Sequence, residues 1–287
     1  MARNLVEEQL SYFVDRDQEV KDFCAMLAAG SKRVLTVCGD EGFGKTLLME
    51  RLISECAAKN WQLVKVICRD TRNDALFIMR SLSRELKLDL EPAEDALAVP
   101  SAPRVDVHWH GSVASNLRVE QGGRVGDITG AKVTLTADLM ERWEQESARI
   151  QRQRLGQLTE EFVRKLAEVL SDKPIVVFID DCHILTVETE KWLREELLFA
   201  VEQGPLSNVY FVLFSQRETV FENWDFLVQG VRLKPFARDD IAAYLRRRGL
   251  DAVADVTSLL LHISEGRVST VASYVERLLD DRRRSAG

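Results

Sequence analysis

Cysteine is scarce in this 287-residue sequence, and its spacing excludes the sites that depend on cysteine pairs. No CxxC motif and no cysteine–histidine ligand spacing occurs, so neither a disulfide framework nor a zinc site is expected. An odd number of cysteines, some at the ends of apolar runs, indicates free buried thiols in a reducing cytoplasm. The five cysteines are Cys24, Cys38, Cys56, Cys68 and Cys182.

Long apolar runs are also missing. The runs Ile175–Ile179 and Val209–Phe214 are far shorter than the about 20 residues that a membrane span needs. The first residues, Met1–Glu8, lack the apolar core of a signal peptide. We therefore expect a cytoplasmic protein with no membrane partner.

Positive charge is in slight deficit. The 39 lysines and arginines against 46 acidic residues give a net charge of −7, which disfavours nucleic-acid binding over the whole surface. Two basic clusters, Arg246–Arg248 and Arg282–Arg284, leave local contact with nucleic acid open, although such clusters are also typical of solvated helix ends. With 46% hydrophobic and 30% charged residues, the composition is that of a folded globular protein rather than a disordered one.

Strand-like and helix-like segments alternate in both halves of the chain, which predicts an α/β fold with a parallel sheet covered by helices. Short β-branched or apolar runs predict the strands, and apolar residues at helical spacing predict the helices. The predicted strands are 33–38, 62–67, 174–180, 208–214 and a short edge strand at 231–233. The helices predicted before and between these strands are 17–29, 46–58, 74–86 and 189–201.

The middle of the chain breaks this alternation, and we interpret residues 88–136 as an insertion. Residues 88–104 contain three prolines and predict a loop. Alternating apolar and polar residues over 105–135 predict one or two β-hairpins, whose edge is a candidate docking surface. His108 and His110 share one face of that pattern but lack a third metal ligand. A charged helical pattern follows over about 138–170, with Gly156 as a candidate break, and either packs on the core or extends towards a partner.

No strand pattern remains after Pro235. Residues 237–248, 253–263 and 268–279 predict helices. We therefore predict a core domain over residues 1–233, with the insertion, and a helical domain over residues 234–287.

The segment Gly39-Asp-Glu-Gly-Phe-Gly-Lys-Thr46 matches the pattern GxxxxGK[ST], and it lies between a predicted strand and a predicted helix. Glycines let such a loop wrap tightly, so its N–H groups point at phosphate oxygens, and the following helix favours an anion at its N-terminus. In this pattern Lys45 reaches the β- and γ-phosphates, and the Thr46 hydroxyl is a ligand for Mg²⁺. The expected nucleotide-binding residues here are Gly39, Asp40, Glu41, Gly42, Phe43, Gly44, Lys45, Thr46 and Leu47.

Two carboxylates directly follow the apolar run 175–179. Asp180 and Asp181 would lie at the carboxyl edge of a buried strand, where ligands bind in open α/β sheets. Together with the glycine-rich loop, this predicts that Asp180 helps to hold Mg²⁺ and that Asp181 orients or deprotonates an attacking water. Arg217 follows the next strand and is a candidate contact for a γ-phosphate, with a surface arginine in a loop as the alternative.

In their order along the chain, these segments resemble the STAND class of signal-transducing P-loop ATPases, which are relatives of AAA+ and origin-recognition ATPases. In that class a phrase like FxGRxxEL precedes the P-loop and packs near the adenine. Phe13, Arg16 and Glu19 match the phrase, and Asp15 replaces its glycine. The resemblance implies that Phe13, Val14 and Arg16 help to bind the nucleotide.

The same resemblance extends to the C-terminal helices. Leu233-Lys-Pro-Phe236 matches the phrase that opens the family's helical lid and implies nucleotide binding by Pro235, and Arg217 matches the family's arginine after strand 4. The resemblance implies a P-loop three-layer sandwich with sheet order 5-1-4-3-2 and a helical lid. One departure is Val268, which stands where the lid usually has a proline, and Arg267 is a candidate substitute sensor.

The resemblance implies an Mg²⁺-dependent ATPase that binds ATP or ADP and turns over slowly, with Lys45, Asp181 and Arg217 as catalytic residues. Such a switch would control a homo-oligomer or a partner effector subunit, in the setting of bacterial defence or stress signalling. The alternatives are an origin-recognition-like, DNA-associated ATPase and a nucleotide-dependent scaffold that does not hydrolyse. Nucleic acid is the less favoured partner because the chain is acidic.

Overall fold

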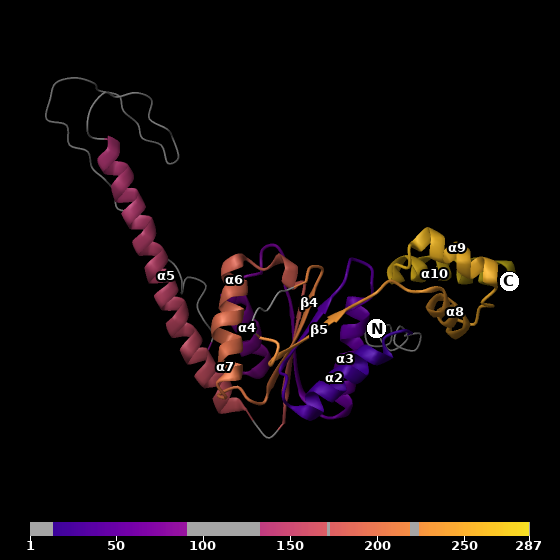
Figure 1. Cartoon of the computed structure of the whole chain (residues 1–287), viewed down its shortest axis with the longest axis horizontal. Coiled ribbons are helices and arrows are strands. Elements are labelled where there is room, and N and C mark those ends of the chain that lie inside the picture. Colours follow the sequence, from indigo (N-terminus) through magenta and orange to yellow (C-terminus); the bar gives the residue numbers. More distant parts are fainter. Residues whose placement is uncertain (1–13, 91–132, 171–172, 219–223, 287) are drawn as a thin grey trace. The chain divides into compact units, whose positions relative to one another are not determined.

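The computed structural model describes residues 14–90, 133–170, 173–218 and 224–286 (Figure 1). These residues fall into two compact units, one of residues 14–90 and 161–286 and the other of residues 133–160. Within these residues no helix combines the length and apolar character needed to cross a membrane. The candidate site lies in the first unit.

A five-stranded parallel sheet forms the centre of the first unit (Figure 1). Its order is β2-β3-β4-β1-β5, which confirms the order 5-1-4-3-2 implied by the resemblance. The central strand β4 and its neighbour β3 are buried at every position, as expected for apolar strands covered on both faces. The strands are β1 (Val34–Cys38), β2 (Gln62–Ile67), β3 (Ile175–Asp180), β4 (Val209–Ser215) and β5 (Val228–Arg232).

Helices cover both faces of the sheet, so the predicted three-layer sandwich is confirmed. Figure 1 shows α2 (Asp17–Ala29) and α3 (Lys45–Ala58) on one side of the sheet and α4 (Ala75–Leu86) with α6 (Val187–Trp192) and α7 (Leu198–Glu202) on the other. A π-helical segment, Leu193–Leu197, joins α6 to α7. The helical spacing seen in the sequence explains the packing, because the apolar stripe of α2 is its buried face: Val20, Phe23, Met26 and Leu27.

Three C-terminal helices form a lid with its own apolar core. They are α8 (Arg238–Arg247), α9 (Ala254–Ser264) and α10 (Val268–Ala286). The core combines Ile241 and Leu245 of α8 with Leu260, Val271 and Val275, and it also buries Val14 from the N-terminal segment. The proposed domain boundary between residues 233 and 234 stays a prediction.

The helix after the insertion differs from its prediction at two points. Helix α5 (Val133–Val169) begins five residues before 138, so residues 133–135 are helical rather than the end of a hairpin. The last three residues of the alternating pattern over 105–135 do not by themselves separate the strand period from the helical one, and a helix propagates cooperatively from its stable part. The helix also continues through Gly156, since one glycine costs only about 1 kcal/mol relative to alanine. The rest of the predicted hairpins, with His108 and His110, lies outside the described residues.

Candidate functional site

The loop between β1 and α3 wraps tightly because two of its glycines have positive φ angles. Gly42 has φ +83° and Gly44 has φ +86°, a region that side chains with a Cβ atom rarely adopt. Gly44 is the residue before α3, and its carbonyl oxygen accepts the first helical hydrogen bond, from the Leu48 amide at 2.9 Å. The loop therefore delivers the chain into the N-terminus of α3, where the helix dipole favours an anion.

The Lys45 side chain folds back over the same loop. Its Nζ donates hydrogen bonds to the carbonyl oxygens of Gly39, at 2.6 Å, and of Asp40, at 3.0 Å. Burial lowers the pKa of Lys45, whereas the nearby carboxylates of Asp180 and Asp181 raise it. A cation that is hydrogen-bonded to main-chain oxygens near two carboxylates is well placed to exchange these oxygens for a bound anion.

Asp180 and Asp181 end strand β3 at the carboxyl edge of the sheet. Asp180 is buried, and its Oδ1 accepts a hydrogen bond from the Asp181 amide at 2.9 Å. Burial, followed by the Asp181 carboxylate, raises the pKa of Asp180. Asp181 has φ +57°, and its half-exposed carboxylate lies 3.9 Å from His183 Nδ1. The turn thus separates a buried carboxylate from one that solvent reaches.

Thr46 and Asp180 could hold a hard divalent cation, because hydroxyl and carboxylate oxygens are the ligands that Mg²⁺ prefers. A buried carboxylate beside a second carboxylate, as at Asp180, gains from a nearby cation. No group of three or more histidine, cysteine, aspartate or glutamate side chains capable of holding a metal occurs among the described residues. A cation here would therefore draw further ligands from water and from a bound phosphate.

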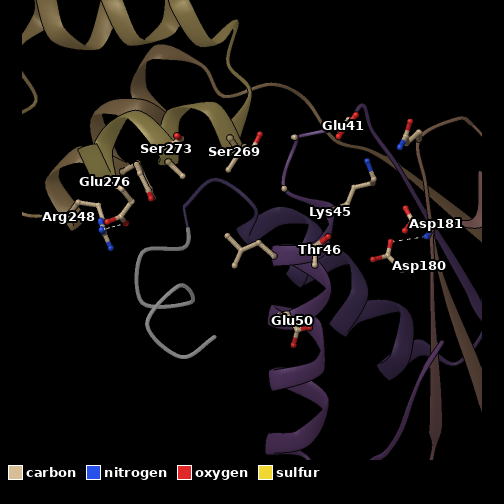
Figure 2. Close-up of a pocket in the computed structure, with 17 residues that line it drawn as sticks. Glu41, Lys45, Thr46, Glu50, Asp180, Asp181, Arg248, Ser269, Ser273 and Glu276 are labelled. Atoms are coloured by element: carbon tan, nitrogen blue, oxygen red, sulfur yellow. Dashed lines mark hydrogen bonds and ion pairs between the residues drawn. The ribbon is translucent and has the colours of Figure 1, made fainter. Parts of the chain in front are cut away.

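These groups meet at a cavity of about 870 Å³ between the sheet edge and the lid (Figure 2). Figure 2 shows Lys45 between Asp180 and Asp181 on one side and the lid residues Ser269 and Ser273 on the other. The core wall consists of Glu41, Gly42, Gly44, Lys45, Thr46, Leu47, Glu50, Asp180, Asp181 and Gln216. The cavity thus brings together the end of the glycine-rich loop and both carboxylates that the sequence predicted.

The segment that follows strand β4 places Gln216, rather than the predicted Arg217, in the wall of this cavity. Gln216 lines the cavity, whereas Arg217 is exposed, and the Arg217 amide donates to Ser215 Oγ at 3.1 Å. The loop therefore carries Arg217 beside the site without placing it in the wall. Its contact with a phosphate stays a prediction.

Several other predicted residues surround the loop without lining the cavity. Arg16 is buried, and its Nη2 donates to the carbonyl oxygens of Phe43, at 3.3 Å, and of Lys234, at 2.7 Å. The Arg16 guanidinium therefore ties the glycine-rich loop to the segment that leads into the lid. Val14 packs in the lid core and Pro235 packs beside Gly266. Gly39, Asp40 and Phe43 belong to the loop but not to the cavity wall, and Phe13 lies outside the described residues.

The lid wall of the cavity was not predicted from the sequence. It consists of Tyr244, Arg248, Val268, Ser269, Ala272, Ser273 and Glu276. The cavity residues that belong to α10 recur at helical spacing. This spacing could have identified one face of α10, but it does not reveal which segment packs against that face. The Ser269 amide donates to the Gly42 carbonyl oxygen at 3.1 Å, so the first turn of α10 contacts the loop directly.

Arg267, the candidate sensor, does not line the cavity. Its side chain is 55% exposed and its Nη2 lies 3.6 Å from the Glu265 carboxylate. Val268, at the position of the family's proline, instead lies against Gly44, where an added Cβ would be 3.7 Å from Val268 Cγ1. The lid therefore approaches the loop through an apolar side chain and the Ser269 amide.

Comparison with known proteins identifies related domains. The family model of the AAA ATPase domain matches residues 12–209. No curated protein sequence matches the chain. Among solved structures the chain is similar to Drosophila ORC bound to DNA, at 12% identity and a TM-score of 0.50, over 99% of this chain and 61% of that one.

Two archaeal structures are similar at lower scores. One is Cdc6p from Pyrobaculum aerophilum, at 15% identity and a TM-score of 0.46, over 81% of this chain and 48% of that one. The other is a Signal Transduction ATPase with Numerous Domains that has a tetratricopeptide repeat sensor, from Pyrococcus horikoshii, at 14% identity and a TM-score of 0.44, over 89% of this chain and 28% of that one. The chain thus spans from about a quarter to about three fifths of the length of these structures.

Proposed function

Because the chain belongs to the AAA ATPase domain family, we propose that it is a slow, Mg²⁺-dependent ATPase that works as a nucleotide-controlled switch. The single observation that carries the proposal is that the glycine-rich loop, two carboxylates and the lid border one cavity. A ligand there would touch the core and the lid at once. Its binding and release would therefore change the free energy of lid closure.

In the proposed mechanism, Lys45 leaves the carbonyl oxygens of Gly39 and Asp40 and donates to the β- and γ-phosphates of ATP. Thr46 and Asp180 would hold Mg²⁺, which neutralises phosphate charge when it is bound. Asp181 orients the attacking water and accepts its proton, since its carboxylate lies at the cavity and is accessible to solvent. The balanced reaction is ATP + H₂O → ADP + phosphate.

The contact between the lid and the loop supports the switch. The Gly42 carbonyl oxygen and the Ser269 amide are hydrogen-bonded, and both residues line the cavity. A nucleotide that reshapes the loop would shift this hydrogen bond and with it the first turn of α10. We infer that the lid position reports the bound nucleotide to a partner effector subunit or to a second copy of the chain.

Phosphate release by the purified protein tests the proposal. We expect slow release from Mg²⁺-ATP by the wild-type protein and at least about a hundredfold less by the Asp181→Asn variant, with ATP affinity retained. Glu188→Gln, which removes an exposed carboxylate outside the cavity, is the matched control and should leave the rate unchanged. Equal rates for wild type and Asp181→Asn would contradict the proposed role of Asp181.

The same assay separates the two alternatives. A DNA-associated ATPase would be stimulated by duplex DNA, with a stimulation that falls steeply as salt increases. A scaffold that does not hydrolyse would bind ATP with no phosphate release, and Asp181→Asn would then change neither affinity nor assembly. Slow release without DNA, together with its loss in Asp181→Asn, would favour the proposed switch.

A further inference from the structure

The α10 wall of the cavity carries a row of polar side chains that leads away from the glycine-rich loop. Ser269, Ser273 and Glu276 are four and three residues apart, so they share one face of the helix, and all three line the cavity (Figure 2). The Ser269 amide donates a hydrogen bond to the Gly42 carbonyl oxygen of the loop. At 1.5 Å per residue, Glu276 lies about 10 Å further along the helix axis. The row therefore reaches from the glycine-rich loop, where we propose that the phosphates bind, to the opposite end of the cavity, where Glu276 and Arg248 lie (Figure 2).

An ion pair closes that opposite end. Glu276 pairs with Arg248, which follows the last turn of α8 (Figure 2). The Arg248 side chain is 7% exposed and that of Glu276 is 52% exposed, so a buried arginine holds a carboxylate that remains accessible. An ionised carboxylate has about four acceptor positions, so Glu276 keeps acceptor capacity towards the cavity while it pairs with Arg248.

The chemistry of this end suits an uncharged polar ring rather than a phosphate. Among the described lid residues that line the cavity, Arg248 and Glu276 are the charged ones, and their charges oppose each other. Apolar and aromatic surface lies nearby in the wall, from Leu47, Ala272 and Tyr244. Apolar and aromatic walls with a few placed polar groups are typical of pockets that bind small ligands, and a nucleobase suits such walls.

We propose that Glu276, held in place by Arg248, accepts a hydrogen bond from the amino group of adenine and selects adenine over purines with a carbonyl there. The inference rests on the proposed function, because it requires the triphosphate on the glycine-rich loop. Adenine presents an amino donor beside a ring-nitrogen acceptor, which matches a carboxylate beside a guanidinium. Guanine presents two acceptors on the same edge, so its carbonyl oxygen would face the Glu276 carboxylate.

Binding of ATP and inosine triphosphate tests this inference, because on the base edge formed by position 6 and N7 the two ligands differ only in the amino or carbonyl group that Glu276 would read. We expect the wild-type protein to bind ATP at least about tenfold more tightly than inosine triphosphate, the discrimination expected for a paired base edge. In Glu276→Gln the preference should fall below about threefold, because an amide both donates and accepts. Glu265→Gln is the matched control: it removes a lid carboxylate that pairs with Arg267 outside the cavity, and it should keep the wild-type preference.

Arg248 is a positioning residue in this scheme, and the ratio of the two affinities tests its role. Arg248→Ala should lose the preference for ATP, and Arg248→Lys, which keeps the charge beside Glu276, should restore much of it. An unchanged ratio in Glu276→Gln, or equal affinities in the wild type, would overturn the inference while leaving the proposed function intact. Failure of the wild type to bind either nucleotide would instead overturn the proposed function. The wild-type comparison needs no variant, so it decides even if a substitution prevents folding.

Discussion

The Ser269 amide, in the first turn of α10, donates a hydrogen bond to the Gly42 carbonyl oxygen of the glycine-rich loop, with 3.1 Å between the two atoms. The approach is so close that a Cβ atom added to Gly42 would lie 2.6 Å from Ser269 Oγ. The lid therefore touches the loop at a position where a side chain would force the Ser269 hydroxyl to move.

The substitution Gly42→Ala is expected to lower the melting temperature of the protein. It places a side chain at φ +83°, which costs about 1–2 kcal/mol, and it clashes with Ser269 Oγ. The double variant Gly42→Ala/Ser269→Ala should recover the part of the stability loss that the clash causes. Without Ser269 Oγ, the lid atom Ser269 Cβ would lie 3.7 Å from the added Cβ. Thermal unfolding of both variants and of Ser269→Ala alone measures this coupling. Additive effects would contradict the contact.

Gly266 offers a sharper steric comparison, because Gly249 has nearly the same backbone angle. Their φ angles are +73° and +72°, but a Cβ at Gly266 would lie 2.6 Å from the Phe236 carbonyl oxygen, whereas nothing lies within 4 Å at Gly249. We expect Gly249→Ala to lower the free energy of unfolding by about 1 kcal/mol, from backbone strain. Gly266→Ala should lower it by about 3 kcal/mol or more, because the overlap adds to the strain. Equal losses in chemical denaturation would rule out the steric contact.

The substitution Arg16→Ala is expected to loosen the glycine-rich loop and the entry to the lid together. It removes the donor to the partly buried carbonyl oxygens of Phe43 and Lys234, and an acceptor left without its donor away from solvent costs about 1–3 kcal/mol. Urea unfolding should therefore show a loss of about 3 kcal/mol, and ATP affinity should fall as well. Arg51→Ala, which breaks a partly exposed ion pair with Glu55 on α3, is the control and should cost about 0.5 kcal/mol. An equal loss in the free energy of unfolding for the two variants would contradict the role of Arg16 in holding the loop to the lid segment.

Asp15 is expected to make stability depend on pH. Burial, followed by charge repulsion from Asp240 of the lid, raises the pKa of Asp15 from 3.8 to about 6, although the neighbouring Arg16 guanidinium lowers it. Folding therefore takes up a proton, and the stability from that proton is present below pH 4 and lost as the pH rises through about 6. Asparagine tolerates the φ of +55° at this position. The Asp15→Asn variant should therefore become more stable relative to the wild type as the pH rises from 4 through about 6.

The expected gain of Asp15→Asn is on the order of 1 kcal/mol at pH 7.5, since the side chain is 38% exposed and solvent screens its charge. Chemical denaturation of both proteins at several pH values between 4.5 and 7.5 measures it. If the free energy of unfolding changed with pH in the same way for both proteins, the raised pKa of Asp15 would be contradicted.

Local patterns in the sequence were enough to predict most of the fold. The glycine-rich loop and the carboxylates Asp180 and Asp181 could be placed at one sheet edge because each follows an apolar strand, and parallel strands end at the same edge. Where a pattern was short or mixed, the prediction was less accurate. The first three residues of α5, 133–135, continued the alternating pattern before them and were therefore not predicted as helix, and no local signal marked the π-helical segment at Leu193–Leu197.

The lid wall of the site could not be predicted because it depends on contacts between distant segments. Glu276 and Arg248 are ordinary surface residue types, and only the packing of α8, α9 and α10 brings them to the cavity. Arg16 illustrates the same limit. The sequence identified it beside the glycine-rich loop, but its acceptors at Phe43 and Lys234 come from segments far apart in the chain.

Titration of Mg²⁺-ATP into wild type and Lys45→Ala by calorimetry tests the nucleotide site most directly. We expect one ATP to bind per wild-type chain, and about a hundredfold weaker binding to Lys45→Ala, because a charge-assisted contact to phosphate is lost. Lys59→Ala, which removes an exposed lysine at the end of α3, should bind as the wild type does. Equal ATP affinity in wild type and Lys45→Ala would contradict a nucleotide site at this loop.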